Sequence, residues 1–256
     1  MAPPKYKTPP QLPPLFIATK DSLVEEAKAL CGKTRKLLDQ IVADVTEDNA
    51  TFENVVLPMA HDENEVELEA RIIGFYQAVS TDSKLRDASS KAEEIMDEFQ
   101  IEASMREDVF KLVDAAWKKA QEGEGPELDG ESMRLLEKER KSYIRNGLGI
   151  EKGPKRNRFK EIKKRLSLIR IEFQKNLNEE NGGIWFTKKE LEGVPLDVLD
   201  TFEKGSGDKE GKLRFTFKYP DLFPTLKFAL DAETRQKVFI ENENKVSIAV
   251  KFCPSY

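Results

Sequence analysis

The chain has 256 residues, of which 35% are charged and 39% are hydrophobic, and its 47 acidic and 42 basic side chains give a net charge of −5. The acidic excess argues against a general nucleic-acid-binding protein, which normally carries a basic surplus, and no apolar run approaches the ~18 to 20 residues that span a bilayer. Because Cys31 and Cys253 are the only cysteines, a disulfide framework is excluded and a reducing, cytoplasmic compartment is expected.

Residues 1–19 form a proline-rich segment that holds six of the thirteen prolines. Proline lacks a backbone N–H and disfavours helix in the residue before it, so the segment is predicted to be an extended arm. It has no apolar signal core and no arginine, which makes it a poor secretory or transit peptide. A ligand for a polyproline-recognition domain is an alternative, but an arm that packs ahead of the first helix is favoured.

Residues 20–181 show apolar side chains at every third or fourth position, the spacing of amphipathic helices. Thr19 or Asp21 can cap the first helix. Thr51 begins the second helical region, and Pro58 either kinks that helix or marks its start. Turns at Ser80–Asp82 and Gln121–Pro126 separate later helices, so five or six long antiparallel helices are predicted.

The last helix of this region is predicted over residues 155–181. One stripe of apolar side chains runs along it: Phe159, Ile162, Leu166, Ile169, Phe173 and Leu177. The preceding Asn146-Gly147 pair predicts a helix end, because glycine adopts the left-handed conformation without strain. The second helical region carries a similarly broad apolar face between Val66 and Val79.

Residues 182–245 no longer show the long helical periodicity of the preceding region. Thr187 and Glu190 match a capping box, which predicts the start of a short helix. Leu213, Phe215 and Phe217 alternate with polar residues, which predicts a strand with one buried face. Two short helices are expected after the prolines that follow. The predicted fold class is therefore mostly α, with a short strand-containing segment near residues 211–219.

His61 is the only histidine in the chain. A His-Glu-x-x-His zinc site needs two histidines four residues apart on one helix face, together with a carboxylate that activates water. That site cannot be built here, so the catalytic, cofactor-binding and metal residues are each predicted to be none. The His61-Asp62-Glu63 run is interpreted as a solvated segment, with a His/carboxylate metal site built across helices as a minor alternative.

Three other features have ordinary structural interpretations. Cys31 lies near the apolar stripe of the first helix and is predicted to be a small buried residue. Residues 151–165 are basic and are interpreted as a solvated helix face, with nucleic-acid or acidic-peptide binding as alternatives. The Gly182-Gly183 and Gly205-Ser206-Gly207 sequences are predicted to be turns or hinges, since no Gly-Lys-Ser/Thr follows them.

Five stretches, in the same order along the chain, resemble one family. They are "ARIIGFYQAVSTDSKLRDAS" from Ala70, "EKERKSYIRNGLGI" from Glu137, "IKKRLSLIRIEFQKNLNEE" from Ile162, "FTKKELEGVP" from Phe186, and "LRFTFKYPDLFPTLKFALDAETRQKVFIENENK" from Leu213. From about Pro13 to Lys245 the chain resembles thimet oligopeptidase, neurolysin and the fungal saccharolysin/MepB-type peptidases, and it is most similar to the fungal branch.

The resemblance implies a mostly helical, two-domain enzyme whose deep channel admits short peptides. One zinc ion, held by a His-Glu-x-x-His helix and a downstream glutamate, would activate water. In that scheme residues 20–181 are the N-terminal, channel-wall domain and residues 182–245 are the start of a truncated catalytic region. None of the family's zinc ligands or catalytic residues maps onto this sequence.

The expected molecule is thus the N-terminal fragment of a zinc metalloendopeptidase, inactive alone, with no bound zinc. It is expected to be a monomer that binds neither nucleic acid nor membrane. The alternative is a non-catalytic helical adaptor that binds peptides or a partner protein. A coiled-coil structural protein is the weakest interpretation, because heptads are not sustained through the turns.

Residues 246–256, "VSIAVKFCPSY", have no family character. Val246-Ser247 can be encoded by a splice-donor sequence, so this tail is hypothesised to be a translated intron that causes the truncation. In a truncated chain Phe223, Phe228 and Phe239 are expected to be exposed, which predicts a tendency to aggregate.

Overall fold

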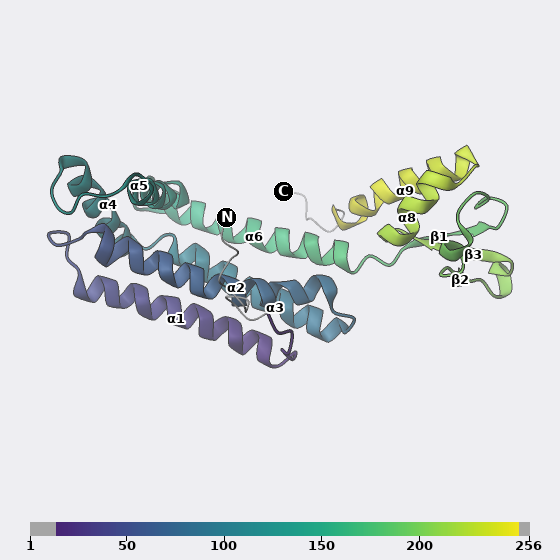
Figure 1. Cartoon of the computed structure of the whole chain (residues 1–256), viewed down its shortest axis with the longest axis horizontal. Coiled ribbons are helices and arrows are strands. Elements are labelled where there is room, and N and C mark those ends of the chain that lie inside the picture. Colours follow the sequence, from purple (N-terminus) through teal and green to yellow (C-terminus); the bar gives the residue numbers. More distant parts are fainter. Residues whose placement is uncertain (1–13, 251–256) are drawn as a thin grey trace, which may run out of the picture. The chain divides into compact units, whose positions relative to one another are not determined.

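The computed structural model describes residues 14–250, with side chains up to residue 245, and the chain divides into two compact units, Met1–Ile171 and Glu172–Tyr256 (Figure 1). Most of the proline-rich segment and the end of the tail therefore lie outside the described residues. The first unit contains α1 (Ser22–Asp44), a π-helical turn η1 (Phe52–Val56), α2 (Leu57–Val79), α3 (Ser83–Ala103), α4 (Glu107–Glu122), α5 (Gly130–Tyr143), a second π-helical turn η2 (Ile144–Leu148) and α6 (Pro154–Asn178), which continues into the second unit.

Side-chain caps set the starts of several helices as the sequence predicts. The Thr19 hydroxyl accepts the Ser22 backbone N–H at 3.1 Å at the start of α1. At the second helical region Thr51 and Asn54 cap each other, side chain to backbone in both directions. Pro58 lies in the first turn of α2, directly after the π-helical turn η1, which runs into α2 at Leu57. Pro58 therefore marks the change from the π-helical turn to the α-helix.

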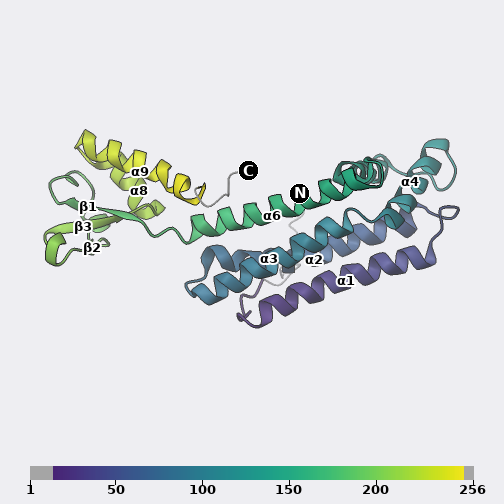
Figure 2. The ribbon, with the colours of Figure 1, turned by 180° about the vertical axis from the view of Figure 1, so that it is seen from behind.

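Helices α1, α2 and α3 lie side by side along their lengths, and Figure 2 shows the same arrangement from behind. Their shared core is small, because Leu23 and Ala27 of α1 meet Ile73 and Tyr76 of α2 and Ala92 of α3. The small alanines are fully buried at these contacts. This end of the first unit is therefore held by a thin layer of apolar side chains.

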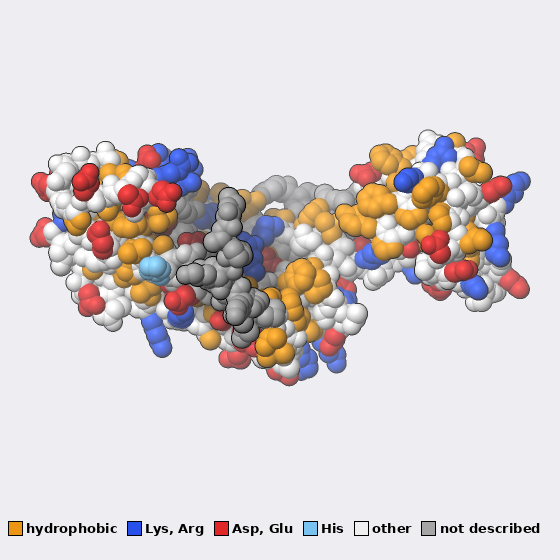
Figure 3. All heavy atoms as spheres, viewed as in Figure 1, with side chains coloured by type: hydrophobic (Ala, Val, Ile, Leu, Met, Phe, Trp, Pro, Cys, Tyr) orange, Lys and Arg blue, Asp and Glu red, His pale blue; other side chains and the backbone are white. Residues whose placement is uncertain are grey.

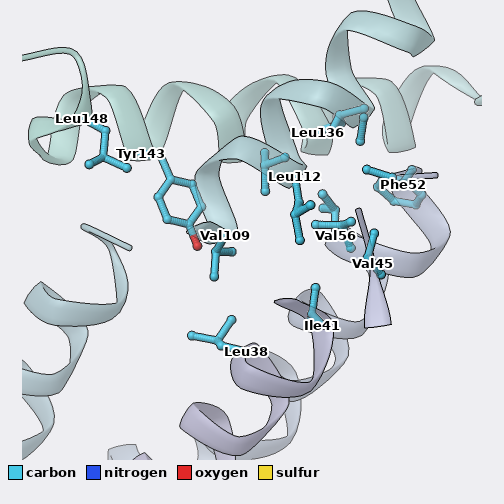
Figure 4. Close-up of a cluster of buried hydrophobic side chains, with 14 residues drawn as sticks. Leu38, Ile41, Val45, Phe52, Val56, Val109, Leu112, Leu136, Tyr143 and Leu148 are labelled. Carbon is cyan, nitrogen blue, oxygen red and sulfur yellow. The ribbon is translucent and has the colours of Figure 1, made fainter. Parts of the chain in front are cut away.

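A larger core forms at the other end of α1, where α4 and α5 pack against it. Figure 4 shows the side chains that meet there: Leu38, Ile41 and Val45 from α1, Phe52 and Val56 from η1, Val109 and Leu112 from α4, and Leu136, Tyr143 and Leu148 from the α5 region. Burial of apolar area is the main driving force for such a cluster, at about 25 cal/mol per Å². This cluster is the principal core of the first unit.

Gly147 has a φ of +115° inside η2. A Cβ atom there would lie 2.8 Å from the ring of Phe159. The glycine is thus needed both for the backbone conformation and for the close packing of α6 on the turn.

Two apolar helix faces are partly uncovered. On α6, Leu166 is 60% exposed and Ile162 is also exposed, and charged side chains link α6 to α3, including the 2.5 Å ion pair between Lys164 and Glu98. On α2, Phe75 and Val79 are exposed although Ile73 and Tyr76 are buried. Periodicity identifies an apolar face but not whether another element covers it.

The second unit contains β1 (Gly183–Thr187), α7 (Leu196–Leu199), β2 (Glu203–Lys204), a 3₁₀ turn η3 (Gly207–Lys209), β3 (Lys212–Thr216), α8 (Tyr219–Phe228) and α9 (Ala232–Val250). The strands form an antiparallel sheet in the order β1-β3-β2, with Phe186 opposite Leu213 and Glu203 opposite Arg214. Leu213 and Phe215 are buried on one face of β3, which confirms the predicted strand.

The capping box of the second unit does not open a helix. The Thr187 backbone N–H donates to the Glu190 carboxylate at 2.7 Å, and the Glu190 N–H donates to the Thr187 hydroxyl at 3.3 Å. These bonds close a turn after β1, and the short helix α7 begins only at Leu196. The strand β1 itself was missed, although Ile184-Trp185-Phe186-Thr187 has the β-branched and aromatic composition of a strand.

Candidate functional site

His61 lies on α2 with an exposed side chain, visible as the single pale-blue patch in Figure 3. Among the described residues, no group of three or more histidine, cysteine, aspartate or glutamate side chains could hold a metal ion. The minor alternative of a metal site built across helices is therefore not found in the part of the chain that the structure describes.

Cys31 lies on α1 and is buried. Burial raises the pKa of its thiol, and the nearby positive charge of Arg35 only partly offsets this. A protonated, buried thiol is a poor nucleophile, which agrees with the predicted role as a small packing residue.

The basic stretch at residues 151–165 is largely paired within the chain. Lys152 and Arg156 both form ion pairs with Glu107 at the start of α4, and Lys164 pairs with Glu98 of α3. The Lys160 amine lies 3.8 Å from the carboxylate of Glu102, which is also on α3. These side chains join α6 to the helices beside it.

The glycine-rich sequences of the second unit have structural roles. Gly205 donates its backbone N–H to Lys212 at 2.9 Å and closes the connection between β2 and β3. Gly183 is the first residue of β1 and lies opposite Thr216, so it belongs to a strand and not to a hinge.

A cavity of about 750 Å³ lies within the first unit. Its walls come from α1, α2, α3 and α5, with one residue, Arg170, from α6. Apolar side chains such as Leu30, Val66 and Met96 form part of the wall. Sequence reasoning missed this cavity because its walls come from helices far apart along the chain.

Three carboxylates around the cavity lack an ion pair with any described lysine or arginine: Asp62, Glu63 and Glu139. Asp62 is only 7% exposed, and its carboxylate accepts a hydrogen bond of 2.5 Å from the Thr34 hydroxyl. The interpretation of His61-Asp62-Glu63 as a solvated run is therefore wrong for Asp62. The residue lies four positions before Val66 on the inner face of α2, and this spacing is the only sequence signal for its burial.

Glu139 of α5 is the most perturbed carboxylate of the cavity. Burial raises the pKa of its side chain, and the negative charge of Glu63 raises it further. No arginine or lysine among the described residues offsets either effect, so the lining has an unneutralised negative charge.

The two arginines at the cavity are already paired. Arg71 forms an ion pair of 2.6 Å with Glu67 on the same helix. Arg170 pairs with Asp97 at 2.5 Å and with Glu93 at 3.1 Å. On the α3 side one arginine, Arg170, therefore partly neutralises two carboxylates, whereas three carboxylates on the side formed by α2 and α5 have no ion pair.

No protein-family model matches the chain, but it is similar to several known oligopeptidases. Saccharolysin of Saccharomyces cerevisiae is 35% identical over 240 residues, covering 93% of this chain. Oligopeptidase PhomG' of Diaporthe leptostromiformis is 32% identical over 94% of the chain, and the thimet-like oligopeptidase of Dictyostelium discoideum is 33% identical over 67%. The chain is a homologue of these oligopeptidases. The family resemblance found in the sequence is thereby confirmed.

The match covers only part of each oligopeptidase. It spans 33% of saccharolysin, 20% of PhomG' and 25% of the Dictyostelium protein. The zinc ion that the resemblance implies fits no set of ligands among the described residues, because no three or more of their histidine, cysteine, aspartate or glutamate side chains form a group that could hold a metal ion. No catalytic step can be assigned to the residues described.

The second unit of this oligopeptidase homologue exposes large apolar side chains on α8 and α9, and Figure 3 shows hydrophobic atoms gathered there. Phe223, Phe228 and Phe239 are all exposed, as predicted. We call Phe223, Phe228, Phe239 and Ile240 the apolar face of the second unit. Among the described helices, none is both long and apolar enough to cross a membrane.

Proposed function

We propose that the chain is the N-terminal, non-catalytic part of a saccharolysin-type zinc oligopeptidase that hydrolyses short peptides. The observation that carries the proposal is the alignment of 240 residues with saccharolysin, which uses nearly all of this chain but a third of that enzyme. The printed sequence has one histidine, and a His-Glu-x-x-His site requires two. The 256 residues alone therefore do not hydrolyse peptides in this proposal.

Within this proposal the helical residues 20–181 contribute a wall of the peptide channel, and residues 182–245 begin the catalytic region. The apolar face of the second unit supports this assignment, since exposed patches of this kind mark surfaces that another part of a protein covers. The proposed chain is a cytoplasmic monomer, with no zinc of its own, and residues 246–256 lie outside the family homology.

A second candidate function is a non-catalytic helical adaptor that binds peptides or a partner protein. The cavity of the first unit favours it, because a cavity of about 750 Å³ with polar and apolar walls is of the size that holds small ligands. The two candidates differ in whether the helical unit supports peptide hydrolysis when a catalytic part is joined to it.

A chimera tests the proposal. The segment of saccharolysin that aligns with this chain is replaced by the aligned 240 residues, and hydrolysis of a quenched fluorescent peptide is measured. The intact 256-residue chain and saccharolysin lacking the segment serve as controls. We expect the chimera to hydrolyse the peptide and both controls to be inactive.

Two results would contradict the proposal. One is hydrolysis by the isolated chain that a metal chelator abolishes. The other is a chimera that is folded by circular dichroism and yet inactive, which would favour the adaptor function.

A further inference from the structure

We propose that the cavity between α1, α2, α3 and α5 binds the lysine or arginine side chain of a short peptide together with the apolar residues beside it. The inference rests on the proposed function for its ligand class, short peptides, and narrows that class to cationic ones. The cavity lies entirely within the first unit.

The charge of the lining is the first argument. Six acidic side chains and two arginines line the cavity, and both arginines form ion pairs with acidic residues of the same lining. Asp62, Glu63 and Glu139 form no ion pair with a described lysine or arginine, although the charge of Lys33, which pairs with Glu65, also acts on Asp62. A positively charged ligand would therefore meet complementary charge on the α2 and α5 side.

The burial of Asp62 is the second argument. Its side chain is 7% exposed, and the only hydrogen bond that it accepts from a described side chain comes from the neutral Thr34 hydroxyl. A carboxylate removed from water is unfavourable unless an opposite charge compensates it. An ammonium or guanidinium group would form the missing charge-assisted hydrogen bonds.

The pair of Glu63 and Glu139 in the lining is the third argument. The two carboxylates come from different helices, α2 and α5, and the charge of Glu63 adds to burial in raising the pKa of Glu139. A cation between them would replace this repulsion with attraction. The lining thus has a place for a positive charge that the described chain does not fill.

The apolar walls decide the kind of cation. Leu30, Val66, Met96, Phe99 and Leu135 line the cavity alongside the carboxylates. A polyamine would use the acidic groups but leave these side chains in contact with water. A peptide with apolar residues on each side of a lysine or arginine would contact both.

The test uses the intact 256-residue chain and fluorescein-labelled pentapeptides. A peptide with lysine between leucines is compared with two others, in which norleucine or glutamate replaces the lysine, and with spermidine as a competitor. Binding is measured by fluorescence anisotropy at low salt. We expect the lysine peptide to bind about tenfold or more tightly than the norleucine peptide, the size of effect that a partly buried charge pair contributes.

Variants locate the site. Asp62→Asn and Glu139→Gln keep the shape of the side chain and remove its charge. Each is expected to lower the affinity for the lysine peptide by about tenfold. Glu69→Gln is the matched control, because Glu69 is exposed on the same helix and does not line the cavity. This control is expected to change affinity by less than about twofold. Glu63→Lys, at an exposed position, should reverse the preference toward the glutamate peptide, and thermal melts verify that each variant is folded.

Three results would overturn the inference. They are equal binding of all three peptides, equal loss of affinity in Glu69→Gln and Asp62→Asn, and displacement of the lysine peptide by spermidine at concentrations as low as those at which the peptide itself binds. The result for the cavity can be distinguished from the result for the proposed function. If the chimera is active but the isolated chain does not select among the peptides, only the cavity proposal is contradicted. If the isolated chain binds peptides according to charge but the chimera is inactive, the oligopeptidase role is contradicted and the cavity proposal stands.

Discussion

The first unit is stabilised by ion pairs between helices in addition to its apolar core. Arg106 at the start of α4 pairs with Asp39 of α1 and with Asp108, and Arg140 of α5 pairs with Asp114 of α4. The second unit is built around aromatic rings instead, with Phe215 in edge-to-face contact with Phe186 and Phe217.

The two units also differ in the surface that each leaves for binding. The first unit contains a cavity of about 750 Å³ with polar and apolar walls. A small sheet with a dense aromatic core fills its interior and leaves other apolar side chains outside. The first unit therefore offers a charged cavity, whereas the second offers an apolar face.

Removing the central ring of the second unit has the largest expected effect. Phe215→Ala deletes a fully buried side chain that contacts three other phenylalanines. We expect a loss of about 3–5 kcal/mol in unfolding free energy. Hydrogen exchange should lose protection in the second unit and keep it in the first; equal loss in both units would show that they do not unfold separately.

Removing an ion pair of the first unit should have a smaller and salt-dependent effect. Arg140 donates to the 18%-exposed Asp114 carboxylate at 2.5 Å and stacks over Trp117 with its guanidinium 4.4 Å from the ring centre. Arg140→Leu is expected to cost about 1–2 kcal/mol from the lost cation–π and charged contacts. Urea unfolding at low and high salt measures the loss in unfolding free energy. A loss that is the same at both salt concentrations would indicate that the variant loses packing alone.

Changing the apolar face of the second unit should alter association more than stability. Phe239 is 56% exposed, so Phe239→Ser is expected to change the unfolding free energy by less than about 0.5 kcal/mol. Light scattering should show less self-association of the variant than of the unchanged chain. Equal scattering, with a sharp reversible melt of the unchanged monomer, would contradict the predicted tendency to aggregate.

The smallest effect on stability is expected at Glu139, and here the substitution should stabilise the chain. Burial raises the pKa of Glu139 in the folded chain, so the folded state holds its proton more tightly than the unfolded state does. Relative to Glu139→Gln, the wild-type chain should therefore lose stability as pH rises from the ordinary glutamate pKa through the raised pKa of Glu139. Thermal melts across this pH range should show a small gain for the variant at neutral pH and none at low pH.

Local patterns were sufficient to predict much of the fold. Apolar side chains at every third or fourth position predicted the long helices, and the alternation of Leu213 and Phe215 with polar residues predicted β3. Both patterns follow directly from helix and strand geometry. The cap at Thr51 and the position of Pro58 followed from backbone chemistry within a few residues. The oligopeptidase relationship was likewise visible in short sequence stretches.

The site depended on contacts that no local pattern contains. Asp62 looked like part of a solvated charged run, but in the folded chain it is buried at a cavity that Glu139 of α5 also lines. The capping box at Thr187 closes a turn after β1, which pairs with β3, and two apolar side chains of α6, Ile162 and Leu166, are exposed. The sequence by itself determined which segments are helix or strand, since those choices are local. Tertiary structure alone decided which faces are covered and which charges are left without partners, since these depend on residues distant in the chain.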